Sequence, residues 1–170
     1  MTPIVSIIMG STSDMPVMEA AAKYLNDMQI PFEINALSAH RTPELVEEFA
    51  KNAAYKGIKV IIAAAGGAAH LPGVIAASTI LPVIGVPIKT TMGMEAWDSM
   101  LSIIQMPPGI PVATVGVNAA QNAAILATQI LAVADPEIRE KVAAKKASLA
   151  DKITKANEEL KKVKFDYKTN

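Results

Sequence analysis

Short apolar runs alternate with helical segments along most of the chain, and this alternation restricts the possible folds more than any other feature. The β-type runs lie at 4–9, 32–37, 58–64, 82–88 and 111–117. Most of them carry apolar side chains at consecutive positions, as expected for strands of a parallel sheet that helices cover on both faces. Because crossovers between parallel strands are right-handed, the pattern predicts a doubly wound α/β fold, a three-layer α/β/α sandwich.

The segments between the runs carry helix start and stop signals. Asp14 stands two residues before Pro16, and Thr42 directly precedes Pro43, so each pair predicts a capped helix start. Gly57 is expected to end the second of these helices. Further helices are expected through Trp97, Leu101 and Ile104, and over 119–133.

The last segment, from about 136 to 164, differs from the rest of the chain. Its pattern predicts one long charged helix with an apolar stripe, so we divide the chain into an α/β domain at 1–134 and a C-terminal helix at 135–170. Such a helix either lies on its own domain or docks on a neighbouring subunit, and its length and composition favour the neighbour. The stripe consists of Ile138, Val142, Leu149, Ile153, Ala156, Leu160 and Val163.

The composition narrows the classes of function. Hydrophobic residues make up 51% of the chain and charged residues 19%, an excess that favours burial of some apolar surface against another subunit. The net charge of zero gives no reason to expect nucleic acid or an anionic membrane as a partner. The absence of cysteine excludes disulfides, thiolate nucleophiles and cysteine-based metal sites. With no signal-peptide pattern and no apolar run of about 20 residues, we expect a cytoplasmic protein.

Three unusual loops follow the first three predicted strands, at 10–14, 38–41 and 63–73. In an open parallel sheet, ligands bind outside the carboxyl ends of the strands. The topology therefore brings the polar residues of these loops to one edge of the sheet, and we expect a binding site there.

The first loop, GSTSD, stands at a turn from strand to helix. Backbone N–H groups at a helix N-terminus, together with the Ser11 and Ser13 hydroxyls, suit a phosphate, and Asp14 suits the hydroxyls of a ribose. The alternative is plain capping and turn chemistry. The loop lacks the Gly-Lys-Ser/Thr of a P-loop, and the chain has no GxGxxG fingerprint.

The second loop places His40 beside Arg41, the only arginine before residue 139. A histidine can both give and take a proton near neutral pH, and an arginine can hold a phosphate with two parallel hydrogen bonds. The alternative is a surface histidine beside a salt-bridged arginine. The isolation of Arg41 in the domain favours the functional interpretation.

The third loop, AGGAAH, carries almost no side chains before His70. It suits either close approach of backbone amides to a small planar ring or carboxylate, or tight packing of a helix on a strand. His70 is either a second site residue or a residue with a structural hydrogen bond. Two separate histidines without cysteine make a poor metal site, so no metal is expected.

Two further segments stay open between a structural and a binding role. QMPPGIP, at 105–111, is either a rigid connection into the fifth strand or a cover over the substrate. Trp97, the only tryptophan, is expected to serve in packing or as a pocket wall.

Four motifs together resemble one known family. MGSTSD, SAHRTPE, AGGAAHLPG and QMPPGIPVATV occur in order and at the expected spacing. They are similar to the N5-carboxyaminoimidazole ribonucleotide mutase family of purine biosynthesis, over about 4–134. Ala64 stands where that family often has glycine, which would narrow the third loop slightly.

The resemblance implies a flavodoxin-like fold, a homo-octamer whose C-terminal helix reaches a neighbour, and a reaction without cofactor or metal. The carboxylate moves from the exocyclic nitrogen of the substrate to C4 of its imidazole. His40 corresponds to the general acid and base, and Arg41 to the phosphate-binding arginine. The expected substrate-binding residues are Ser11, Ser13, Asp14, Ser38, Ala39, Arg41, Gly66, Gly67, Ala68, Ala69, His70 and Leu71.

Two other functions compete with the mutase. A sister branch carboxylates aminoimidazole ribonucleotide directly with carbon dioxide, but it lacks AGGAAHLPG in this form. A ribonucleotide-binding module without turnover is the other alternative. The presence of a histidine beside the phosphate site disfavours it, because binding alone needs no base.

Overall fold

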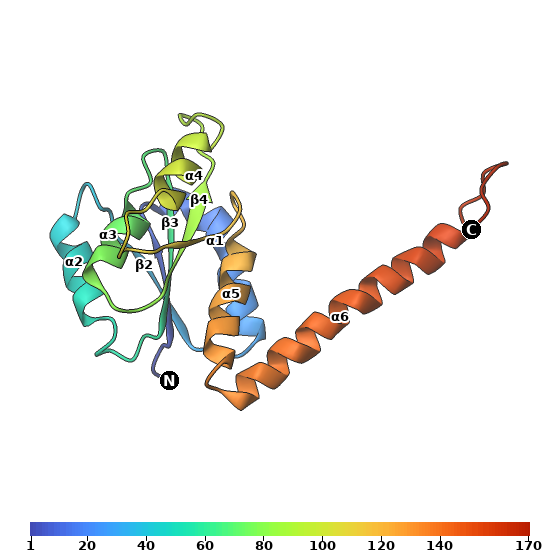
Figure 1. Cartoon of the computed structure of the whole chain (residues 1–170), viewed down its shortest axis with the longest axis horizontal. Coiled ribbons are helices and arrows are strands. Elements are labelled where there is room, and N and C mark those ends of the chain that lie inside the picture. The colour runs from blue at the N-terminus through green and yellow to red at the C-terminus, as the bar shows by residue number, and fades with distance from the viewer.

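A five-stranded parallel sheet forms the centre of the computed structural model, which describes all residues from 1 to 170 (Figure 1). The strand order is β2-β1-β3-β4-β5, the flavodoxin-like order. The chain winds outward in one direction from β1 to β2 and in the other from β3 to β5. The strands are β1 Val5–Met9, β2 Phe32–Ala36, β3 Val60–Gly66, β4 Val83–Ile88 and β5 Ala113–Thr114.

Helices cover both faces of the sheet, which confirms the predicted three-layer sandwich. One core cluster joins the sheet to α1 and α5, and the second joins it to α2, α3 and α4. The helices are α1 Met15–Asp27, α2 Pro43–Asn52, α3 Leu71–Ser78, α4 Trp97–Ile104, α5 Ala120–Ala132 and α6 Pro136–Lys161, with a short 3₁₀ turn, η1, at Thr12–Asp14.

The period of two along the central strands explains the double core. On β1, Ile7 belongs to the cluster under α1 and α5, whereas Ile8 belongs to the opposite cluster. On β3, Ile62 and Ile61 divide in the same way. All four side chains are fully buried, so both faces of these strands need apolar residues. Ala64 lies among these buried residues of β3, so it fills the core and does not narrow the following loop.

Several local predictions were wrong. The run at 111–117 forms a strand only at Ala113–Thr114, because this edge strand pairs with β4 over two residues. Helix α3 was not predicted, since its sequence contains Pro72 and Gly73. Trp97 is 60% exposed and lines no part of the binding cleft described below, so it provides neither internal packing nor a pocket wall within this chain.

Two predicted helix caps also differ from the structure. Asp14 and Thr42 do stand at the N-cap positions of α1 and α2, but neither side chain caps its helix. The Thr42 hydroxyl instead accepts the backbone N–H of Ser38 at 3.0 Å and bonds the Ser38 carbonyl at 3.1 Å. These bonds close the loop that follows β2. Gly57, with φ of +94°, lies five residues beyond the end of α2 and ends the connection rather than the helix itself.

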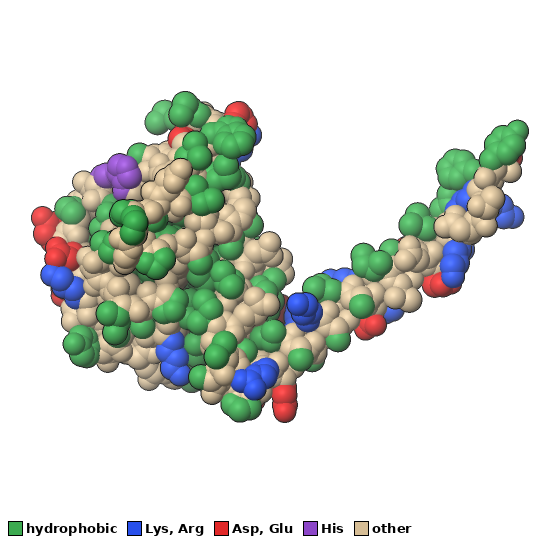
Figure 2. All heavy atoms as spheres, viewed as in Figure 1, with side chains coloured by type: hydrophobic (Ala, Val, Ile, Leu, Met, Phe, Trp, Pro, Cys, Tyr) green, Lys and Arg blue, Asp and Glu red, His purple; other side chains and the backbone are tan.

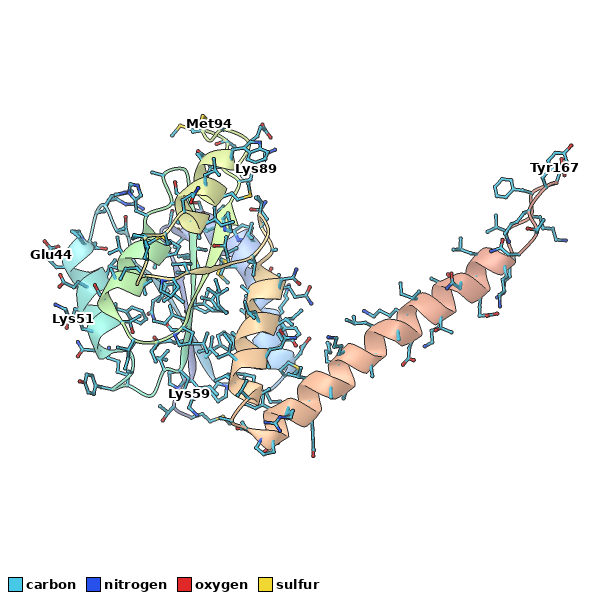
Figure 3. All side chains as sticks on the ribbon, in the orientation of Figure 1. Glu44, Lys51, Lys59, Lys89, Met94 and Tyr167 are labelled. Carbon is cyan, nitrogen blue, oxygen red and sulfur yellow. The ribbon has the colours of Figure 1, made fainter.

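Helix α6 extends away from the sandwich as a straight arm (Figures 1 and 2). Asp135 caps its start by accepting the N–H groups of Glu137 and Ile138, and Ile138 is buried against the domain. Farther along, Leu149 is 54% exposed and Ile153 is 65% exposed. The arm therefore does not lie on its own domain, and Figure 3 shows Tyr167 beyond its far end. No helix of the chain combines the length and apolar character that crossing a bilayer requires.

Candidate active site

A cleft of about 400 Å³ lies at the carboxyl edge of the sheet, where the three predicted loops meet. The ends of β1, β2, β3 and β4 each contribute to its wall, as expected for this class of fold. Figure 2 shows histidine atoms exposed at the rim of the domain. The lining residues are Gly10, Ser11, Ser13, Asp14, Ser38, Ala39, His40, Arg41, Ala65, Gly66, Ala69, His70, Leu71 and Thr90.

The loop after β1 places a buried carboxyl in this cleft. Ser11 caps η1 by accepting the Ser13 N–H at 3.3 Å, and the Asp14 N–H bonds the Ser11 carbonyl at 3.1 Å. The resulting tight turn leaves Asp14 only 7% exposed. Burial raises the pKa of the Asp14 carboxyl above its usual value, and hydrogen bonds from Ser11 and Ser13 offset part of that rise. The cleft therefore holds an acceptor that carries its negative charge less readily than an exposed aspartate.

Arg41 is held in place by two neighbouring segments. Its Nη2 donates to the Gly10 carbonyl at 2.8 Å, and its Nε donates to the Ser38 hydroxyl at 3.2 Å. The guanidinium consequently joins the end of β1 to the loop after β2. A guanidinium has five N–H donors, so three are left to bind an anion.

His40 and His70 form a pair across the cleft. The Nε2 of His40 lies 2.7 Å from the Nδ1 of His70, and the ring centroids are 4.9 Å apart in an edge-to-face arrangement. His40 comes from the loop after β2, whereas His70 directly precedes α3. Both side chains are exposed, so solvent or a ligand can reach them. The pair joins the second and third predicted loops. His70 thus forms a hydrogen bond with His40, the candidate acid and base.

The third loop approaches the cleft closely because it lacks bulk at one position. A Cβ at Gly66 would lie 2.3 Å from Cγ2 of Thr90 and 3.2 Å from the Ile88 carbonyl, so no larger residue fits without a shift. Gly67 has φ of +60°, and the non-glycine Ala69 has φ of +44°. Such positive angles turn the chain sharply between β3 and α3.

Most of the predicted site residues line the cleft, and two do not. Gly67 and Ala68 belong to the third loop but are not part of the cleft wall. The expected site residues did not include Gly10 and Ala65, although both lie in the predicted loops, nor Thr90, which lies outside those loops. Thr90 follows β4, so applying the rule of strand ends to the fourth strand as well would have found it. The two histidines and the acidic residues form no group of three that could hold a metal ion.

The sequence of the chain matches one family model over most of its length. Residues 4–152 match the model described as AIR carboxylase. The chain belongs to this family. The match includes all the cleft residues as well as α6 as far as residue 152.

Individual relatives of this family are similar along most of the chain. The N5-carboxyaminoimidazole ribonucleotide mutase of Pyrococcus abyssi is 61% identical over 140 residues, 82% of this chain and 80% of that protein. The mutase of Thermotoga maritima is 52% identical over 163 residues, 96% of this chain and 95% of that one. A phosphoribosylaminoimidazole carboxylase of Saccharomyces cerevisiae is 54% identical over 140 residues, but these make up only 24% of that longer protein.

A solved structure supports the fold. The crystal structure of Treponema denticola PurE superposes with a TM-score of 0.82 at 33% identity, covering 94% of this chain and 99% of that chain. The flavodoxin-like architecture predicted from the sequence is thereby confirmed, including its long C-terminal helix.

Proposed function

We propose that this protein is an N5-carboxyaminoimidazole ribonucleotide mutase, which converts its substrate to 4-carboxy-5-aminoimidazole ribonucleotide in purine biosynthesis. The observation that carries the proposal is the 61% identity with a mutase over 140 residues, which make up 82% of this chain. The arrangement of charged and titratable groups in the cleft supports it independently.

The substrate is a ribonucleotide, and the cleft has a suitable group for each of its parts. Arg41 holds the phosphate through the guanidinium donors that Gly10 and Ser38 leave free. Ser11 and Ser13 add hydroxyl donors to the phosphate or ribose, and Asp14 accepts from the ribose hydroxyls. The wall around the heterocycle is completed by Ser38, Ala39, Ala69 and Leu71.

His40 supplies the proton transfers. As the carbamate C–N bond breaks, His40 gives a proton to the exocyclic nitrogen, and carbon dioxide is released beside the ring. C4 then attacks the carbon dioxide, and His40 removes the C4 proton, which restores the aromatic ring. Positioned proton transfer of this kind typically contributes about 10²–10⁴-fold to the rate.

The third loop retains the carbon dioxide between these steps. If the gas escaped, the turnover would be lost, so the pocket around the ring must be small and exclude water. The glycine at position 66 lets the β3 loop lie against Thr90, which leaves little space at this end of the cleft. Gly67 and Ala68 are not part of the cleft wall, so they would have to approach the ring when substrate binds.

We propose further that the protein is a homo-octamer in which α6 packs on a neighbouring subunit, with 1–134 as the catalytic domain. The exposed apolar side chains of the arm support its packing on a neighbour. A phosphorylated substrate does not cross membranes, so the protein is expected to act in the cytoplasm.

Direct carboxylation is the second candidate function, because the yeast relative and the family description both carry the name carboxylase. An isotope experiment separates the two. The substrate is labelled with ¹³C in its carbamate carbon and is converted in an excess of unlabelled bicarbonate. Retention of the label in the product supports the mutase, whereas loss of the label to the bicarbonate pool indicates the carboxylase. If the protein converted neither this substrate nor aminoimidazole ribonucleotide, both candidate functions would be contradicted.

A further inference from the structure

The contact between His40 and His70 restricts where each ring can carry protons. Their nitrogens, Nε2 of His40 and Nδ1 of His70, are 2.7 Å apart, and one hydrogen must lie between them. If both nitrogens carried a hydrogen the contact would be repulsive, and if neither did there would be no bond. The pair therefore has two arrangements, which differ in the ring that donates.

Only one arrangement lets His40 act as a base. If Nδ1 of His70 donated, then Nε2 of His40 would accept, and neutral His40 would carry its proton on Nδ1. Both nitrogens of His40 would then be occupied, and no lone pair would be left for a substrate proton. If Nε2 of His40 donates instead, its Nδ1 is free to take a proton and return it. The hydrogen bond between the rings persists in both protonation states of His40.

No other group of the chain competes for this bond. None of the ion pairs includes a histidine. Asp14 and Arg41 are the charged residues of the cleft, but Arg41 bonds Gly10 and Ser38, and no hydrogen bond joins Asp14 to either ring. His70 is therefore the one side chain that fixes the tautomer of His40.

We propose that His70 is a positioning residue whose unprotonated Nδ1 accepts the Nε2–H of His40, so that Nδ1 of His40 is the atom that transfers protons. This inference deepens the proposed function and depends on it for its kinetic consequences. His70 itself exchanges no proton with the substrate. It keeps its own proton on Nε2 and holds the imidazole of His40 in one orientation throughout the cycle.

Three variants test this assignment. His70→Asn keeps an acceptor, the amide oxygen, near the place of Nδ1, whereas His70→Leu removes it at similar bulk. We expect His70→Asn to retain kcat within about tenfold and His70→Leu to lose on the order of 10- to 100-fold in kcat, with little change in KM. His40→Asn should lose about 10²–10⁴-fold. Equal losses in both His70 variants, or an inactive His70→Asn beside an active His40→Asn, would overturn the assignment.

A spectroscopic readout keeps the inference separate from the proposed function. The chain has only two histidines, so a solid-state ¹⁵N spectrum of full-length protein with labelled histidine rings contains two sets of signals, which His40→Asn assigns. We expect the Nδ1 of His70 to be unprotonated at the pH of the activity assay. A protonated Nδ1 with unprotonated Nε2 on His70 would refute the inference even in an active enzyme. An inactive wild type with the expected spectrum would refute the function alone.

Discussion

The α/β domain and the α6 arm use apolar residues in opposite ways. In the domain, Ile7, Ile62 and Ile84 are fully buried in the core of a single chain. On the arm, Leu149, Ile153 and Leu160 are each more than half exposed. The apolar residues of the sequence therefore include a part that folds the domain and, on α6, a part that finds no partner within the chain. Removing the α6 arm should therefore leave the domain folded.

Truncation before Asp135 tests this division with the largest expected effect. If the arm joins subunits, the shortened protein should fall from the mass of an octamer to a much smaller species, because each subunit loses the apolar surface of α6. Light scattering coupled to size exclusion measures the mass, and circular dichroism checks the fold. An unchanged mass would show that the arm is dispensable for assembly.

A matched pair of substitutions sharpens the comparison. Ile62→Ala should cost about 2–5 kcal/mol of unfolding free energy, because it leaves a cavity in a fully buried strand. The same change on the arm, Ile153→Ala, should cost the isolated subunit less than about 0.5 kcal/mol. Denaturant unfolding at several protein concentrations separates the two effects. The cost of Ile153→Ala should change with concentration only if the arm packs on another subunit.

Arg41→Ala should affect binding without affecting assembly. Loss of charge-assisted bonds to a phosphate should weaken binding of phosphorylated ligands by about 10- to 100-fold. Calorimetric titration with the ribonucleotide and with its dephosphorylated nucleoside measures the difference. An equal loss for both ligands would count against the phosphate role. An altered mass of the variant would contradict the separation of domain and arm.

Asp14→Asn should have the smallest effect, and its sign follows from the raised pKa of this carboxyl. Because burial raises the pKa of Asp14 in the folded state, the native protein holds this proton more tightly than the unfolded chain does. The unfolding free energy of the wild type therefore falls as the pH rises from the unfolded to the folded pKa of Asp14. Above the folded pKa, the destabilisation from the buried charge is fully present. The variant should be slightly more stable than wild type at pH 7. This difference in stability should vanish below about pH 3.8, the ordinary pKa of an aspartate. Thermal unfolding across this range measures it, and a variant that is less stable at pH 7 would contradict the argument.

The sequence predicts the layers of the fold well because buried parallel strands leave a strong signal. The consecutive apolar residues of β1, β3 and β4 locate the sheet, and the rule of strand ends brings their loops together. Helix α3 escaped prediction because Gly73 usually disfavours a helix. In the structure a Cβ at Gly73 would lie 2.9 Å from Cε of Met106, so the glycine makes room for a distant side chain. Contacts of this kind between separate segments cannot be inferred from local patterns.

The same limit applies within the cleft. The sequence indicates His40, Arg41 and the serines by their chemistry and position. It does not indicate that the two histidines are bonded to each other, because they stand 30 positions apart and no local pattern reports a contact over that separation. Nor does it show that the Thr42 side chain closes a loop rather than capping α2, since both roles use the same residue at the same position.

The two hydrogen bonds of Arg41 affect the entropic cost of binding a ligand. Long, flexible side chains usually lose rotational freedom when they grip a ligand, at about 0.5–1.5 kcal/mol each. Here Gly10 and Ser38 already restrict the guanidinium before any anion arrives. Most of this ordering entropy is therefore lost during folding, and the protein meets its ligand with a preorganised anchor.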